Sequence, residues 1–192
     1  MPEPLETLVY TDRLLKAEMV AAFNQDAAFP FSGLRASLQA AVADVCLDRL
    51  VRADGCLRLA RRLAAPGEAD EETLRAAISR AYYSVHHSLR SMALWQNKWD
   101  PDGHEESIKA LKTLLEDNNF RHRSGLLEDT VDRVTEARAN RHVADYSPYK
   151  VQRDPPNTRW IRITNDSWTD AAQFNLDLAA ELSQAAMRFV GS

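Results

Sequence analysis

The sequence has few of the residues that mark several common protein classes. Its 192 residues include only 6 glycines, 8 prolines and 2 cysteines. The scarcity of glycine and proline argues against a β-sandwich, which needs many tight turns. No stretch approaches the roughly 18 continuous apolar residues of a membrane span, and the N-terminus lacks the basic and then apolar layout of a signal peptide. We therefore expect a cytoplasmic protein that does not enter a membrane.

Positive charge is not in excess either. The 24 Lys and Arg stand against 28 Asp and Glu, which gives a net charge of −4. This excludes a generally basic coat for nucleic acid, although it leaves room for a local basic patch. Cys46 and Cys56 fall in one predicted helix, about 15 Å apart along its axis, so they are too distant for a disulfide. No zinc-type spacing of Cys and His occurs, and we predict no metal and no cofactor.

What the sequence does contain is helical periodicity. The hydrophobic fraction of 45% suits a globular protein, and apolar residues recur at steps of three and four over most of the chain. The sequence therefore predicts an all-α, up-and-down bundle of five to six helices, residues 34–192, preceded by an N-terminal extension, residues 1–33. The helices are expected at residues 35–64, 71–96, 104–117, 124–146 and about 166–190, with a shorter one within 12–23 and a short extended piece at 159–164.

The predicted helix 71–96 has two distinct faces. Arg80, Tyr83 and His87 fall close together on the side opposite the core, and Tyr82 and His86 are four residues apart, so their rings can touch. The polar face indicates a partner or ligand surface, with a simple solvated face as the alternative. The core stripe is formed by Leu74, Ala77, Ile78, Ala81, Val85, Leu89 and Met92.

The predicted helix 124–146 carries arginine where apolar residues are expected. Arg141 falls within the apolar stripe marked by Leu127 and Val134, and Arg138 lies at its edge. Arginine is rarely buried without a partner. One explanation is an ion pair with Asp145, one helical turn further on. The other is that the helix end opens into a polar cleft where the guanidinium binds phosphate.

Three elements of the sequence resemble the HEPN domain family. Residues 79–94 contain S-R-A-Y-Y and two histidines, His104 follows the next loop, and residues 141–146 read R-H-V-A-D-Y, similar to R-x-x-A-D-Y. The resemblance implies a four- or five-helix bundle that pairs as a homodimer. It also implies a toxin–antitoxin or defence system, in which such domains bind nucleotides or cut RNA without metal, often beside a nucleotidyltransferase antitoxin.

The resemblance also implies which residues form the site. HEPN nucleases carry Arg and His with four to six residues between them, and these face one another across the dimer cleft. Here Arg141 is followed by polar His142, but Tyr146 occupies the first position at which the motif histidine is expected. We therefore expect binding of RNA or a nucleotide rather than cleavage. An active metal-independent ribonuclease and a purely structural or partner-binding bundle stay open as alternatives. The candidate catalytic residues are Arg141, His142 and Tyr146, and the candidate binding residues are Arg138, Arg141, Asp145, Arg80, Tyr83 and His87.

Overall fold

The structure is a computed structural model that describes most of the predicted bundle. Its backbone is described for residues 32–65, 67, 69–97, 100–101, 103–146, 151–154, 159–162 and 165–191, and its side chains for 40–65, 67, 69–97, 100–101, 103–146 and 167–191. The predicted N-terminal extension, including its helix within 12–23, lies outside the described residues except for Ser32 and Gly33, which begin the first described helix.

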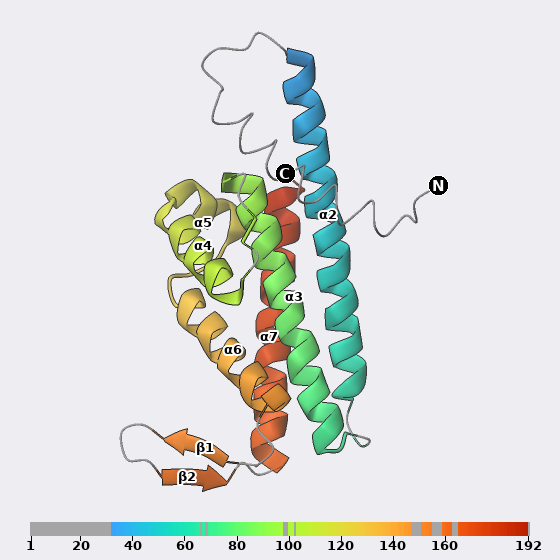
Figure 1. Cartoon of the computed structure of the whole chain (residues 1–192), viewed down its shortest axis with the longest axis vertical. Coiled ribbons are helices and arrows are strands. Elements are labelled where there is room, and N and C mark those ends of the chain that lie inside the picture. The colour runs from blue at the N-terminus through green and yellow to red at the C-terminus, as the bar shows by residue number, and fades with distance from the viewer. Residues whose placement is uncertain are drawn as a thin grey trace.

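The prediction of an all-α bundle is confirmed. The described residues form six helices: α2 (Ser32–Leu63), α3 (Glu71–Asn97), α4 (His104–Glu116), α5 (Asn118–Ser124), α6 (Thr130–Tyr146) and α7 (Asn165–Val190). The long helices α2, α3 and α7 lie side by side, and α4, α5 and α6 cover another side of α3 and α7 (Figure 1). Helix α3 is central, because it packs against α2, α4, α6 and α7.

The hydrophobic pattern explains why α3 holds this central place. Every residue of its predicted core stripe is buried, and Tyr82 is 1% exposed. Its start is fixed by Asp70, whose carboxylate accepts a hydrogen bond from the Thr73 backbone N–H at 2.8 Å. This bond lowers the pKa of Asp70, as is typical of a helix N-cap. The rings of Tyr82 and His86 are nearly parallel, 6.5 Å apart, so the predicted contact between them is confirmed.

The region before α6 differs from the prediction. Asp117 does not simply end a helix, because its carboxylate accepts from the Asn119 N–H and caps the short helix α5. Gly125 then takes a left-handed conformation (φ 72°) that ends α5. Helix α6 consequently begins at Thr130, and Leu127, predicted to be in the core, lies in the loop with 66% of its surface exposed.

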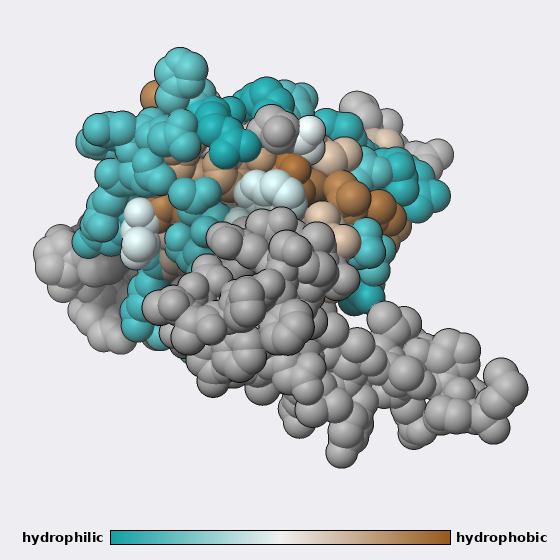
Figure 2. All heavy atoms as spheres, turned by 90° about the horizontal axis from the view of Figure 1, so that it is seen from above, coloured by the Kyte–Doolittle hydropathy of each residue, from teal (hydrophilic) through white to brown (hydrophobic). Residues whose placement is uncertain are grey.

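Two short strands complete the described part of the chain. Val151–Asp154 (β1) and Arg159–Arg162 (β2) pair antiparallel, with Val151 opposite Arg162, so the predicted extended piece is a strand of a hairpin. Seen from above, hydrophobic side chains gather in one part of the described surface, while hydrophilic ones cover most of the rest (Figure 2). None of the described helices has both the length and the apolar character that a bilayer crossing requires.

Candidate functional site

Polar and aromatic side chains converge where α3, α4 and α6 meet. We call this group the junction cluster. Its members come from three separate stretches of sequence, and tertiary packing brings them together. The cluster consists of Tyr82 and Tyr83 from α3, His104 from the start of α4, and Arg138, Arg141 and Tyr146 from α6.

Arg141 lies between two tyrosines at the centre of this cluster. Its Nη2 donates hydrogen bonds to the hydroxyls of Tyr83, at 3.1 Å, and Tyr146, at 3.4 Å. Its guanidinium carbon lies 5.4 Å and 5.2 Å from the centres of the same two rings. At these distances each ring attracts the cation through its electron-rich face. The guanidinium is thereby fixed in orientation, as a binding arginine has to be.

The predicted ion pair of Arg141 with Asp145 is also present. Nε of Arg141 lies 2.6 Å from a carboxylate oxygen of Asp145, and the two side chains are 13% and 22% exposed. Burial lowers the pKa of Arg141, but the charge of Asp145 and the two tyrosines outweigh it, so the net shift is upward. Arg141 is therefore always charged. Its Nη1 makes no hydrogen bond or ion pair with a described residue.

Arg138 lies one turn before Arg141 and faces the same junction. Its Nη2 is 3.1 Å from an oxygen of Glu105, and the two side chains are 38% and 68% exposed. A pair this open to water contributes little to stability, about 0–1 kcal/mol. Burial raises the pKa of the Tyr82 hydroxyl to about 12, while the charges of Arg138 and Arg141 oppose the rise. The hydroxyl of Tyr82 thus lies within electrostatic reach of both arginines.

His104 is the member of the cluster that sequence reasoning left without a role in the site. Its ring centre is 5.3 Å from that of Tyr82, 6.1 Å from Tyr83 and 4.4 Å from His86. Its Nδ1 is buried and has no hydrogen-bond partner among the residues that the structure describes. Burial and the charges of Arg141, Arg138 and Arg90 lower the pKa of His104. The position of His104 after the loop and at a helix start is the sequence signal that could have pointed to this junction.

His86 packs against His104 of the cluster but is itself buried, so it cannot contact a ligand. It is 6% exposed, and its Nδ1 lies 3.1 Å from the hydroxyl oxygen of Ser107 in α4. Burial and the charge of His104 lower the pKa of His86 to about 3. It is therefore neutral at physiological pH and serves to dock α4 onto α3.

The other predicted site residues are not all brought together. Arg80 is exposed on α3 and interacts electrostatically with Cys56 of α2. His87 also faces the α2 side, and burial together with nearby arginines lowers its pKa to about 4. The predicted face of Arg80, Tyr83 and His87 is therefore divided, because only Tyr83 contacts α4 and α6. His142 is exposed, with its ring 5.1 Å from that of Tyr146.

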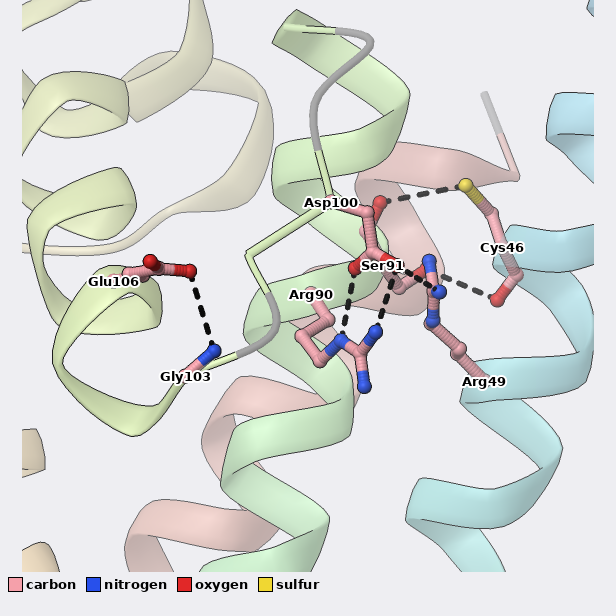
Figure 3. A network of polar contacts seen from close by, with 7 residues as sticks. All are labelled: Cys46, Arg49, Arg90, Ser91, Asp100, Gly103 and Glu106. Carbon is pink, nitrogen blue, oxygen red and sulfur yellow. Dashed lines mark hydrogen bonds and ion pairs between the residues drawn. The ribbon is translucent and has the colours of Figure 1, made fainter. Parts of the chain in front are cut away.

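A second polar network lies on the α2 side of α3. Arg49 of α2 and Arg90 of α3 both reach Asp100 in the following loop (Figure 3). Arg90 donates from Nε and Nη2 at 2.8 Å and 2.7 Å, and Asp100 is only 5% exposed. Nearby, the Ser91 hydroxyl donates to the Cys46 carbonyl at 3.0 Å. These contacts join α2, α3 and the loop before α4.

Comparison of the chain with family models, with curated proteins and with solved structures yields no match. The chemistry of the junction cluster is therefore inferred from its own side chains. Among the described residues, no group of three or more His, Cys, Asp or Glu side chains is arranged to hold a metal ion.

Proposed function

We propose that this protein binds RNA or a nucleotide through a phosphate group at the junction cluster, as a HEPN-domain protein of a toxin–antitoxin or defence system. The observation that carries the proposal is the setting of Arg141, which is 13% exposed and is held between Tyr83 and Tyr146. The family and system follow from the resemblance of three sequence elements. The ligand class follows from the chemistry of the cluster.

The donors of the cluster suit phosphate. A guanidinium offers a planar set of N–H groups that matches two phosphate oxygens. The hydroxyls of Tyr83 and Tyr146 accept hydrogen bonds from Arg141, so their own hydrogens are left to donate to a ligand. Tyr146 is 62% exposed and presents a ring on which a base can stack, a contact typical of single-stranded RNA binding.

The charges of the cluster favour short-range recognition over long-range attraction. Asp145 and Glu105 offset the charges of Arg141 and Arg138. Each phosphate contact in a single strand contributes about −0.7 to the slope of the logarithm of the association constant against the logarithm of the salt concentration. If Arg138 and Arg141 each contact one phosphate, the slope for RNA should be about −1.4. A slope near zero would contradict phosphate contact.

The test is a titration of fluorescently labelled oligouridylate with wild-type protein and with Arg141→Gln. Loss of a charged hydrogen bond is worth about 1.5–3 kcal/mol, so the variant should bind about 10- to 100-fold more weakly. The matched control is Arg58→Gln, because Arg58 is an exposed arginine of α2, with its side chain 66% accessible and paired to Asp54. That variant should bind as the wild type does.

Circular dichroism melting of the same variants separates binding from structure. Arg141→Gln is expected to melt near the wild type and to lose affinity. If it instead binds normally but melts much earlier, Arg141 is a structural ion-pair residue and the proposal is wrong. A folded wild-type protein that binds neither oligouridylate nor any nucleotide would overturn the proposal directly.

A second candidate function is metal-independent RNA cleavage. It is favoured by one observation, that the ring of His104 and the guanidinium of Arg141 both contact Tyr83. In such cleavage a histidine takes the proton of the 2′-hydroxyl, whose oxygen attacks phosphorus, and arginine stabilises the phosphorane charge. The P–O5′ bond then breaks, the 5′-oxygen leaves with a proton from the histidine, and a 2′,3′-cyclic phosphate remains. Incubation of labelled tRNA and mixed RNA in EDTA with wild type, Arg141→Ala, His104→Ala and His142→Ala tests it. Cleavage that the variants lose would support it, and no cleavage by folded protein would rule it out.

The homodimer and the nucleotidyltransferase antitoxin are part of the same proposal and rest on the resemblance alone. Light scattering on purified protein should give twice the mass of one chain. A reading frame for a nucleotidyltransferase beside the gene, and co-purification of its product, would support the toxin–antitoxin setting. If the protein binds RNA as a monomer, the dimer cleft is not needed for binding, and the junction cluster of one chain is the site.

A further inference from the structure

His104 is placed to respond to a ligand at the junction. It begins α4, at the point where α4 faces both α3 and α6. Its ring packs on aromatic rings of α3, and neither its buried Nδ1 nor its Nε2 makes a hydrogen bond to a described residue. A histidine ring whose nitrogens have no such bond can gain a proton and donate it to an incoming oxygen.

The groups that face His104 fix the sign of the local electrostatic field. The cationic ones lie on α3 and α6, and the neutral aromatic ones lie on α3. Glu105 of α4 is the nearest carboxylate in sequence, but it pairs with Arg138. The groups are Tyr82, Tyr83, His86 and Arg90 from α3, and Arg138 and Arg141 from α6.

We propose that His104 is the proton-accepting member of the junction cluster, so that a bound phosphate is held by a protonated His104 together with Arg138 and Arg141. This inference rests on the proposed function, because it requires a phosphate at the cluster. It adds a regulatory property that the bare arginines lack. The site then takes up one proton when it binds its ligand.

The physical reason is charge reversal. In the free protein, burial and the three arginines lower the pKa of His104, so the ring is neutral at pH 7. A phosphate on Arg138 and Arg141 brings negative charge to the same place and raises the pKa of His104 again. By linkage, affinity increases as the pH falls from the bound pKa to the free pKa, by no more than tenfold per pH unit, because one proton is involved. Above the bound pKa and below the free pKa, affinity is constant.

The experiment is a titration with oligouridylate that lacks a terminal phosphate, between pH 8 and pH 5. The remaining phosphodiesters keep one negative charge each across this range, so any pH dependence comes from the protein. In parallel, NMR follows the imidazole signals of the free and the bound protein. We expect the pKa of His104 to rise by about one unit or more on binding, and wild-type affinity to increase about tenfold as the pH falls.

Variants assign the effect to one residue. His104→Gln should bind at every pH as the wild type does at pH 8. The matched control is His122→Gln, because His122 is an exposed histidine of α5 outside the cluster, and this variant should keep the pH dependence. His142→Gln tests the histidine whose ring lies 5.1 Å from that of Tyr146. If His142→Gln removes the pH dependence and His104→Gln does not, the inference is wrong.

The outcomes separate this inference from the proposed function. Oligouridylate binding that depends on Arg141 but leaves the pKa of His104 unchanged overturns the role of His104 and keeps phosphate binding. Absence of binding by folded protein overturns both. Calorimetry in two buffers of different ionisation enthalpy gives an independent measure. An uptake near one proton at a pH between the two pKa values is expected, and an uptake of zero contradicts the inference.

Discussion

Arg141 can form an ion pair and also contribute to a ligand site, the two roles that its place in the sequence allows. Its place in an apolar stripe allowed either an ion pair or a ligand site, and the ion pair with Asp145 is present. The pair uses Nε, whereas Nη2 faces the hydroxyls of Tyr83 and Tyr146. A lysine would supply one charge but neither the planar stacking nor the separate donors. The side chain can therefore stabilise the end of α6 and still recognise an anion.

One buried and one half-buried histidine of α3 make stability depend on pH. The pKa of His86 is lowered to about 3 and that of His87 to about 4, and burial is the largest cause in both cases. The unfolded chain has an ordinary histidine pKa of about 6.5. Between these values only the unfolded chain binds the protons, so the free energy of unfolding should fall as the pH drops from 7 to 4. Urea unfolding at several pH values measures it.

His87→Gln should make that pH dependence shallower. Each histidine contributes at most about 1.4 kcal/mol per pH unit, and the contribution of His87 is reduced because this residue is only half-buried. His122→Gln provides the control, since that side chain is exposed and should leave the slope unchanged. An identical slope in wild type and His87→Gln would show that His87 is not held neutral in the folded protein.

At the scale of elements, periodicity predicted helices well and turns poorly. The stripe of α3 was correct at every position because burial on one face is a property of the helix alone. Helix α5 was missed because Asp117 reads equally well as the stop of one helix or the cap of the next. The role of His104 was missed because the groups that surround it come from α3 and α6. Its place at a helix start points to the junction but does not give the distances to those groups.

The Asp100 network is an element-scale contact that we expect to be sensitive to mutation. Asp100→Asn would replace the carboxylate that pairs with both Arg49 and Arg90, whose side chains are only 9% and 17% exposed, by a neutral amide. Removing one partner of a buried ion pair costs about 3–5 kcal/mol. We expect the free energy of unfolding in urea to fall by that amount.

An exposed ion pair of the same bundle serves as the control for Asp100. Asp54 pairs with Arg58 one turn later on α2, and the side chains are 42% and 66% exposed. Asp54→Asn should cost no more than about 1 kcal/mol. Equal losses for Asp54→Asn and Asp100→Asn would mean that the network around Asp100 is open to water in solution.

At the scale of the whole molecule, α7 connects the layers that carry the junction cluster. It packs against α2, α3, α5 and α6. Asn175, in the middle of α7, is fully buried and donates to the carbonyls of Ile78 in α3, at 3.4 Å, and Ala137 in α6, at 3.2 Å. Its side-chain oxygen accepts from Asn140 at 3.2 Å. One amide therefore sets the position of α6, which carries Arg138 and Arg141, relative to α3.

Asn175→Ala should destabilise the whole bundle and not only one helix. It removes the donor for the carbonyls of Ile78 and Ala137 and leaves a cavity, at a cost of about 2–4 kcal/mol. Hydrogen exchange should show the same loss of protection in α3, α6 and α7, because the three helices share this contact. Gln173→Ala is the matched control, since Gln173 is an exposed amide of α7, and should change stability by less than about 0.5 kcal/mol. Loss of protection confined to α6 would show that α6 docks as a separate unit, and the junction cluster would then form only when α6 is docked.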